Sequence, residues 1–143
     1  MDRKDHKIIS ALRQGARTPL RKISKLVHMS ESAVRKRVKR LEREGVIERY
    51  TVVVNPSKLG YNALAIVSLD TAPEKHHETL ENLTKLDEVK QLVTSAGEHM
   101  IIGTVYAHDN KELTDIILKK IGAIEGVTKV RASVILERVK EIC

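Results

Sequence analysis

The segment spanning residues 30–44 places apolar and basic residues at helical spacing, and this pattern constrains the fold more than any other feature of the chain. At about 100° per residue, Val34, Val38 and Leu41 gather on one side of a helix. Most of the cations lie on the opposite side: Arg35, Lys36, Lys39, Arg40 and Arg43. The segment is therefore predicted to be an amphipathic helix with a basic outer face. Such a face suits a polyanion, because each cation that neutralises a phosphate releases counterions, although a solvated face in a thermostable protein is the alternative interpretation.

The charge of the chain is divided unevenly. The 143 residues have a net charge of +7. Residues 1–60 carry 16 Lys and Arg against 6 Asp and Glu, a net charge of +10, whereas residues 61–143 carry 10 against 13, a net charge of −3. A basic N-terminal part joined to a slightly acidic C-terminal part indicates that only the first part meets an anion.

Two further helices are expected before the basic one. Apolar residues at helical spacing predict a helix over residues 5–14. A second helix is predicted over residues 19–26, with Thr18 as its N-cap and Pro19 at its first position, where the missing N–H costs nothing.

The basic helix is expected to be followed by β structure. Ser30 is the predicted N-cap of a helix over residues 31–44, and Gly45 is expected to end it in a left-handed conformation. The run 46–54 is rich in β-branched residues and predicts a short ribbon or wing. Helix, helix, short turn, helix and then β structure is the order of a winged helix-turn-helix, whose last helix can enter the major groove of DNA.

The second half of the chain is predicted to be a separate α+β domain. Turn residues at both ends of the segment 55–60 indicate a linker between a DNA-binding domain over residues 1–54 and a domain over residues 61–143. The apolar patterns that follow predict strands and helices in the order βαββαβ, which is the ferredoxin-like sandwich. The predicted elements are a strand over 61–69, a helix over 73–87, strands over 89–96 and 100–107, a helix over 111–121 and a last strand over 127–139.

With these residues identified, the chain resembles the leucine-responsive regulator and asparagine-synthetase regulator family (Lrp/AsnC), especially its archaeal members. The resemblance covers nearly the whole length. It is carried by residues 5–12, 16–19, 30–38, 41–47, 55–60, 97–99 and 124–127. The resemblance implies an N-terminal winged helix-turn-helix that binds operator DNA, and a C-terminal αβ-sandwich that dimerises, forms tetramers or octamers and often senses amino acids. It also implies a regulator that can control its own gene.

A set of polar and basic residues is predicted to contact double-stranded DNA. Ser32, Arg35, Lys36 and Lys39 are expected to reach base edges or nearby phosphates, and Arg40 and Arg43 to contact the backbone. Thr18, with Arg17 and Arg21, is expected to hold a phosphate at the start of the second helix. The full predicted set is Arg17, Thr18, Pro19, Arg21, Ser30, Ser32, Arg35, Lys36, Lys39, Arg40, Arg43 and Arg49.

The resemblance also implies a site for a small amino acid, at an interface between dimers. The residues concerned are Ser95, Ala96, Gly97, Glu98, His99, Met100, Ser133, Val134, Ile135 and Leu136. In the family an acidic residue commonly follows the loop that corresponds to 97–99, whereas this chain has Met100, whose thioether cannot pair with an ammonium group. A plain hairpin turn at Gly97 is the alternative interpretation.

Other classes of function have little support in the sequence. His76, His77, His99 and His108 do not share metal-ligand spacing with a thiol or an acidic cluster, and no phosphate loop, nucleophile elbow or dinucleotide fingerprint is present. We therefore expect no enzyme, no catalytic residue, no metal and no cofactor. With no Phe or Trp, the chain also lacks the aromatic side chains on which RNA bases typically stack. An architectural protein that coats the chromosome without sequence preference remains the alternative to a regulator.

The expected location follows from cysteine use and hydropathy. Cys143 is the only cysteine, so an intrachain disulfide is impossible, and a reducing compartment is expected. No apolar run approaches the roughly 20 residues that cross a bilayer, and no signal region follows Met1. We expect a cytoplasmic protein without a membrane partner, which binds duplex DNA and copies of itself.

Overall fold

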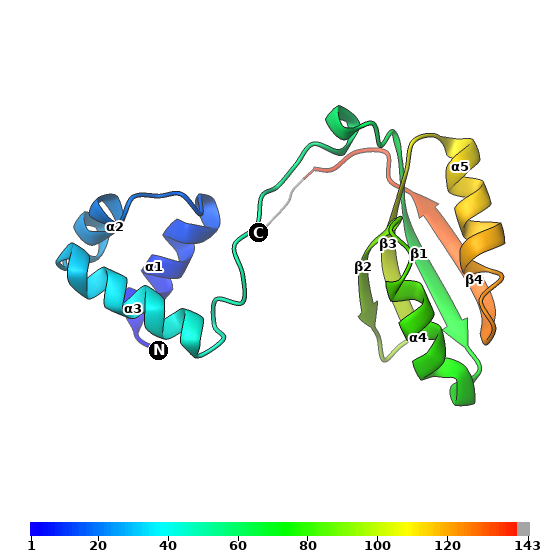
Figure 1. Cartoon of the computed structure of the whole chain (residues 1–143), viewed down its shortest axis with the longest axis horizontal. Helices are drawn as coiled ribbons and strands as arrows, with labels where there is room; N and C mark the ends of the chain where they lie inside the picture. The colour runs from blue at the N-terminus through cyan, green and yellow to red at the C-terminus, as the bar shows by residue number, and fades with distance from the viewer. Residues whose placement is uncertain (140–143) are drawn as a thin grey trace. The chain divides into compact units, whose positions relative to one another are not determined.

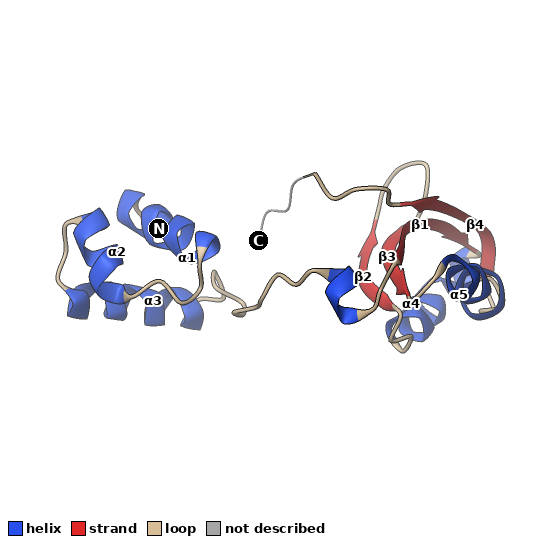
Figure 2. Cartoon of the chain, turned by 90° about the horizontal axis from the view of Figure 1, so that it is seen from above, coloured by secondary structure: helices blue, strands red, loops and turns tan. Residues whose placement is uncertain are grey.

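The computed structural model describes residues 1–139, and Cys143 lies outside the described residues. The chain divides into two compact units, Met1–Val53 and Val54–Val139. The first unit contains three helices, and the second contains a four-stranded sheet with helices on one face (Figures 1 and 2). Each unit has its own hydrophobic core.

The N-terminal unit is built from α1 (Arg3–Gln14), α2 (Leu20–Val27) and α3 (Glu31–Arg43). The helices pack on one another through apolar side chains that are fully buried: Ile8, Ile23, Val27 and Val34. Burying each such side chain contributes roughly 1.5–3 kcal/mol to folding. The predicted helix-turn-helix is confirmed, with α2 and α3 joined by a three-residue turn.

The caps of α3 agree with their prediction. Ser30 accepts a hydrogen bond from the Ala33 N–H on its hydroxyl oxygen at 3.2 Å, which confirms it as the N-cap. Gly45 has a φ of +69°, so it does adopt the left-handed conformation after the last turn. The Val46 N–H donates to the Leu41 carbonyl and the Gly45 N–H to the Glu42 carbonyl, which is the Schellman arrangement.

The cap predicted for α2 is wrong. Pro19 occupies the N-cap position, and α2 begins at Leu20 without a side-chain cap. The Thr18 hydroxyl donates instead to the Gly15 carbonyl at 2.6 Å, beside a backbone hydrogen bond between the same two residues. The hydroxyl therefore closes the turn before α2, and the first N–H groups of the helix are left open.

His28 ends α2 in a strained conformation. It has a φ of +51°, the only positive φ of a non-glycine residue in the described chain. A left-handed conformation costs an L-residue about 1 kcal/mol, and glycine avoids this cost. We expect His28→Gly to raise the free energy of unfolding by up to about 1 kcal/mol, less any loss from the more flexible unfolded chain. Urea unfolding followed by circular dichroism measures this, and a clear destabilisation would contradict it.

The predicted wing is absent. Residues 44–62 contain no strand, although they include the β-branched run 46–54. A strand needs a partner for its backbone groups, and the described residues of this unit contain no other strand to supply one. Val52 and Val53 are accordingly 75% and 54% exposed. After this run, a short 3₁₀ helix (Pro56–Leu59) occupies most of the predicted linker.

The C-terminal unit has the predicted βαββαβ order. Its strands form one antiparallel sheet in the order β2-β3-β1-β4, as in a ferredoxin-like sandwich, which confirms the predicted fold class for this half. The elements are β1 (Ala63–Thr71), a 3₁₀ turn (Pro73–Lys75), α4 (His76–Thr84), β2 (Val89–Thr94), β3 (Ile101–Ala107), α5 (Asn110–Asp115), a π-helical continuation (Ile116–Ile121) and β4 (Val127–Val134). The last strand ends five residues earlier than predicted, and β2 ends two residues earlier.

The core of this unit lies between the sheet and its two helices (Figure 2). Alternate residues of β1, such as Val67 and Leu69, are fully buried, as are Leu83 of α4 and Ile116 of the helix that follows β3. The remaining residues of β1 and β3 lie on the opposite face of the sheet, where Ile66 is 45% exposed. One face of the sheet is therefore covered by helices and the other is open.

Candidate nucleic-acid interface

The outer face of α3 carries the cations that were predicted to contact DNA. Arg35, Lys36, Lys39 and Arg43 are all exposed. Among the described residues, none of these four cations has a polar partner, whereas the neighbouring Ser32 hydroxyl lies 3.0 Å from that of Ser30. Four exposed cations on one helix face are available to bind an anion.

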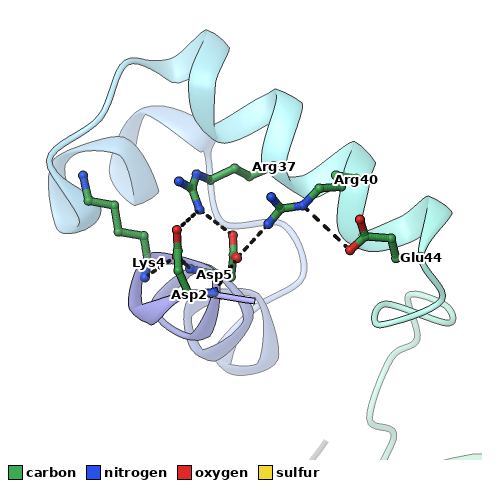
Figure 3. A network of polar contacts seen from close by, with 6 residues as sticks. All are labelled: Asp2, Lys4, Asp5, Arg37, Arg40 and Glu44. Carbon is green, nitrogen blue, oxygen red and sulfur yellow. Dashed lines mark hydrogen bonds and ion pairs between the residues drawn. The ribbon is translucent and has the colours of Figure 1, made fainter.

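The other two cations of α3 lie against the start of α1 (Figure 3). Arg37 donates through Nη1 to Asp2 Oδ2 at 2.6 Å and to Asp5 Oδ1 at 2.8 Å. Arg40 donates through Nη2 to Asp5 Oδ2 at 2.7 Å. Asp5 is 1% exposed, so its charge is taken from water and must be matched inside the protein. The two arginines supply that match.

The same two aspartates also cap α1. The Asp5 N–H donates to the Asp2 carboxylate at 2.9 Å, and the Asp2 N–H donates to the Asp5 carboxylate at 2.8 Å, which makes a capping box. The hydrogen bond from the Asp5 N–H, with help from Arg37, lowers the pKa of Asp2 to about 2. Burial opposes the charge of Asp5, but hydrogen bonds from the Asp2 N–H and Arg37 outweigh it and lower the pKa of Asp5. Both carboxylates are therefore ionised at neutral pH.

This network revises one predicted DNA contact. Arg40 was expected to contact the DNA backbone, but its guanidinium binds Asp5 and lies 3.8 Å from Glu44. A guanidinium held by a buried carboxylate is an element of the fold. Helical periodicity missed this role because it places Arg40 beside the basic face, while the acid that binds it lies 35 residues away in the sequence.

The start of α2 is a second place where cations gather. Arg17, Pro19 and Arg21 are exposed there, and Thr18 is partly buried. The first turn of α2 has no acidic residue and no side-chain cap, so its N–H groups and its positive dipole end face outwards. The structure thus brings Arg17 and Arg21 to a helix N-terminus that can hold a phosphate.

The segment after α3 is tied back to that helix by one hydrogen bond. The Tyr50 hydroxyl donates to Glu42 at 2.6 Å. Burial and this hydrogen bond raise the pKa of Tyr50 to about 12, so the phenol stays protonated at neutral pH. Residues 46–53 and the end of α1 line an open groove of about 700 Å³. Arg49 is exposed in this segment, but without the wing nothing in the structure aims it at a neighbouring groove of DNA.

The loop predicted to bind an amino acid joins β2 to β3. Its first and last residues pair, since the Ser95 N–H donates to the Met100 carbonyl at 2.9 Å. The Met100 N–H in turn donates to Asp70 Oδ1 at 3.3 Å, and His99 Nδ1 lies 3.4 Å from the same oxygen. Sequence reasoning missed Asp70, which lies on β1 beside the loop because the sheet register pairs Leu69 with Ile101. A carboxylate is therefore present next to Met100 after all.

The two parts of the predicted effector site do not meet within one chain. Ser133 on β4 pairs with Ile66, whereas the loop 95–100 lies beside Asp70, four residues further along β1. At about 3.3 Å per residue this places them roughly 13 Å apart along the strand, on opposite sides of it. Val134 ends β4, and Leu136 is 96% exposed beyond it. Within one chain, the two parts of the predicted site therefore lie at opposite edges of β1.

Two further findings concern metal ions and membranes. Within residues 1–139, no group of three or more His, Cys, Asp or Glu side chains is placed to hold a metal ion. In the same part of the chain, no helix has the length and hydropathy to span a bilayer.

Comparison with known proteins identifies both units. An AsnC-type helix-turn-helix domain matches residues 1–42, and an Lrp/AsnC ligand binding domain matches residues 63–142. The HTH-type transcriptional regulator LrpA of Pyrococcus abyssi is 49% identical over 140 residues, which cover 98% of this chain and 99% of the relative. The regulator FL11 of Pyrococcus furiosus is 35% identical over 141 residues, which cover 99% and 93%.

Solved structures share the fold over the full length. The chain superposes on Escherichia coli AsnC with a TM-score of 0.89 at 23% identity, covering 100% of this chain and 97% of that one. A transcriptional regulator of Neisseria meningitidis, solved in complex with L-Met, gives a TM-score of 0.92 at 22% identity, covering 99% and 94%.

A helix-turn-helix unit followed by a ligand-binding α+β unit defines a transcription regulator that binds specific DNA sequences, and not an enzyme. The chain belongs to the Lrp/AsnC family of such regulators. The relatives compared above are HTH-type transcriptional regulators, which favours regulation of genes over the architectural coating of a chromosome.

Proposed function

We propose that the outer face of α3 enters the major groove of operator DNA. The observation that carries this proposal is the division of its six cations: Arg37 and Arg40 are tied to α1, while Arg35, Lys36, Lys39 and Arg43 are exposed without a polar partner in the described chain. Ser32 and Arg35 stand in the first two turns, which reach base edges in helix-turn-helix complexes, and an Arg there can grip guanine bidentately. Ser30, at the N-cap of α3, would contact the phosphates next to these bases.

The start of α2 is proposed to hold the DNA backbone. Its uncapped N–H groups, with Arg17 and Arg21 beside them, offer hydrogen bonds and positive charge to one phosphate, and Thr18 and Pro19 would lie against the same strand. Arg43, near the end of α3, would contact the backbone as well. Such contacts fix the register of the helix on the duplex but carry no sequence information.

The test compares two DNA fragments of equal length and composition. One is the DNA upstream of the protein's own gene, because control of that gene is part of the proposed function, and the other is its scrambled sequence. A specific regulator binds the first roughly 10³-fold or more tightly at physiological salt. If the protein binds the fragment from its own gene no more tightly than the scrambled one, autoregulation is overturned. If no site recovered in a selection from genomic DNA binds more tightly than scrambled DNA, the proposed readout by α3 is overturned.

The open face of the sheet is proposed to bind a second copy of the chain. One helix-turn-helix covers too little DNA for tight selective binding, so two units must read half-sites about 34 Å apart. The open face supports this role because it carries apolar residues such as Leu64 and Ile66, and nothing within residues 1–139 forms a layer over it. Tetramers or octamers would follow from pairing of such dimers, and the assembled regulator would act in the cytoplasm.

Light scattering tests the dimer. Ile66→Glu places a charge on the open face and is expected to shift the protein to monomers. Leu118→Glu is the matched control, because Leu118 is an equally large apolar residue, 65% exposed, in the helical layer. Monomers with the control, or an unchanged mass with Ile66→Glu, would contradict the proposed interface.

The loop 95–100 is proposed to bind a small amino acid together with a second chain. Asp70 supports this role, since its half-buried carboxylate lies beside the loop and can accept from an ammonium group in place of the acid that Met100 replaces. Backbone groups near Gly97 and Ser133 would hold the carboxylate of the bound amino acid. A structurally similar regulator was solved in complex with L-Met. Calorimetry with the twenty amino acids decides this: heat with the wild type that Asp70→Asn removes supports the site, and silence at millimolar concentration overturns it.

A further inference from the structure

The two arginines that α1 holds lie at the border of the basic face of α3. Arg40 is four residues after Lys36 and three before Arg43, so it neighbours both on the helix surface. Arg37 follows Lys36 in the sequence and lies on the side of α3 that faces α1. Both side chains remain partly exposed, at 24% for Arg37 and 36% for Arg40. If their partners were removed, two guanidinium groups beside the basic face would be free to reach phosphates.

We propose that Asp2 and Asp5 limit the affinity of the protein for DNA of any sequence by withholding Arg37 and Arg40 from the phosphate backbone. Contacts to phosphate add affinity for every sequence alike, whereas base contacts add affinity for one. A helix that presents six cations instead of four gains affinity for DNA of any sequence, and its binding becomes more dependent on salt. The Asp2–Asp5 clamp, defined as these two carboxylates with Arg37 and Arg40, keeps the number at four.

The geometry of the clamp also fixes how α3 is rotated about its axis. Asp5 is held on two sides, because its Oδ1 accepts from Arg37 and its Oδ2 from both Arg40 and the Asp2 N–H. The two arginines lie three residues apart, almost one helical turn, so a buried carboxylate grips α3 at two points. Asp5 is therefore a positioning residue, which affects DNA binding by holding the two arginines against α1.

A merely structural role predicts a different result from a withholding role. If the clamp only stabilised the fold, its loss would weaken binding to every DNA and leave the salt dependence unchanged. If it withholds cations, its loss strengthens binding to scrambled DNA and steepens the salt dependence. Each added phosphate contact changes the slope of log affinity against log salt by about −0.9.

The proposal rests on the proposed docking of α3, and the experiment separates the two. Fluorescence anisotropy of the full chain with operator and scrambled duplexes is measured from 0.05 to 0.3 M salt. For Asp5→Asn we expect a slope steeper by about one to two, and an affinity for scrambled DNA at 0.1 M salt that rises about tenfold or more. The affinity for the operator rises by a similar factor, because phosphate contacts add affinity for every sequence alike.

Two companion variants identify the cause. Asp5→Asn combined with Arg37→Met and Arg40→Met removes the freed cations and is expected to return the slope to the wild-type value. Glu48→Gln is the matched control: it removes one negative charge from an exposed residue of the same unit that has no polar partner in the described chain. An equal rise in scrambled-DNA affinity with Glu48→Gln would show a net-charge effect and overturn the proposal.

Folding and docking are checked separately. Circular dichroism at the assay temperature shows whether Asp5→Asn folds, and if it does not, Asp2→Asn carries the test, since Asp2 is 53% exposed and its loss leaves no buried group unpaired. It frees Arg37 only in part, so the slope should steepen by up to about 0.9. An unchanged or shallower slope in the folded variant overturns the clamp.

Lys36→Ala tests the docking itself: if it flattens the slope while the clamp variants do not steepen it, only the clamp proposal fails.

Discussion

Replacing Arg35, Lys36 and Lys39 together with alanine is expected to lower operator affinity about a thousandfold at physiological salt. Each of these side chains is expected to contribute about 1–1.5 kcal/mol through a base or phosphate contact. Three such losses amount to about 4 kcal/mol, and each 1.4 kcal/mol is a factor of ten. The slope of log affinity against log salt should also become shallower, by about 0.9 for each residue that contacts phosphate.

The fold should not change in this variant, because all three side chains are exposed and lack polar partners in the described chain. Surface substitutions of this kind usually alter stability by less than about 0.5 kcal/mol. The control removes three cations from the C-terminal unit: Lys85, Lys111 and Lys119 are changed to alanine. It has the same net charge as the test variant, so equal weakening by both would show that only the overall charge matters.

A second large effect is expected at a glycine of the C-terminal unit. Gly126→Ala should lower the free energy of unfolding by about 3 kcal/mol or more, since it combines backbone strain with overpacking. Gly126 has a φ of +95°, and a Cβ there would stand 2.4 Å from Lys75 Cβ and 2.8 Å from Thr79 Oγ1. The neighbouring backbone cannot move away easily, because the Gly126 carbonyl accepts from the Ala72 N–H and the Glu125 carbonyl from the Thr79 hydroxyl.

Gly45 provides the matched comparison for this prediction. It also has a positive φ, +69°, but a Cβ at this position meets nothing within 4 Å. Gly45→Ala should therefore cost only the backbone strain, about 1 kcal/mol. Urea unfolding of both variants, followed by circular dichroism, separates strain from crowding. Equal costs at the two glycines would contradict the account of Gly126.

Local patterns predicted the elements whose causes are local. The apolar spacing of α3 and its cap at Ser30 depend on residues within one or two turns, and both are confirmed. The alternation of buried residues in β1 and β3 likewise follows from one covered face of the sheet. These features were sufficient to predict a helix-turn-helix and a ferredoxin-like unit.

Features that depend on distant partners were not predicted. The β-branched run 46–54 favours a strand, but no partner strand lies among the described residues of its unit, and the run forms no strand. Arg40 has the spacing of a DNA contact, yet its ion pair with Asp5 joins residues 35 apart. Asp70 lies beside the loop at Met100 only because β1 and β3 are adjacent in the sheet. Periodicity shows which side of an element faces the core, and it cannot show which polar groups will meet.

The central claim, that the outer face of α3 lies in the major groove, can be tested with a chemical probe at one residue. Cys143 is the only cysteine, so Ser32→Cys in a Cys143→Ser background carries a single thiol, in the first turn of α3. An iron chelate that cleaves nearby DNA is attached to this thiol. We predict cleavage inside each operator half-site, at positions about one helical turn apart, and none when the probe is attached through Lys111→Cys in the C-terminal unit. Uncleaved operator with the probe on α3, while the labelled protein still binds it, would contradict the claim.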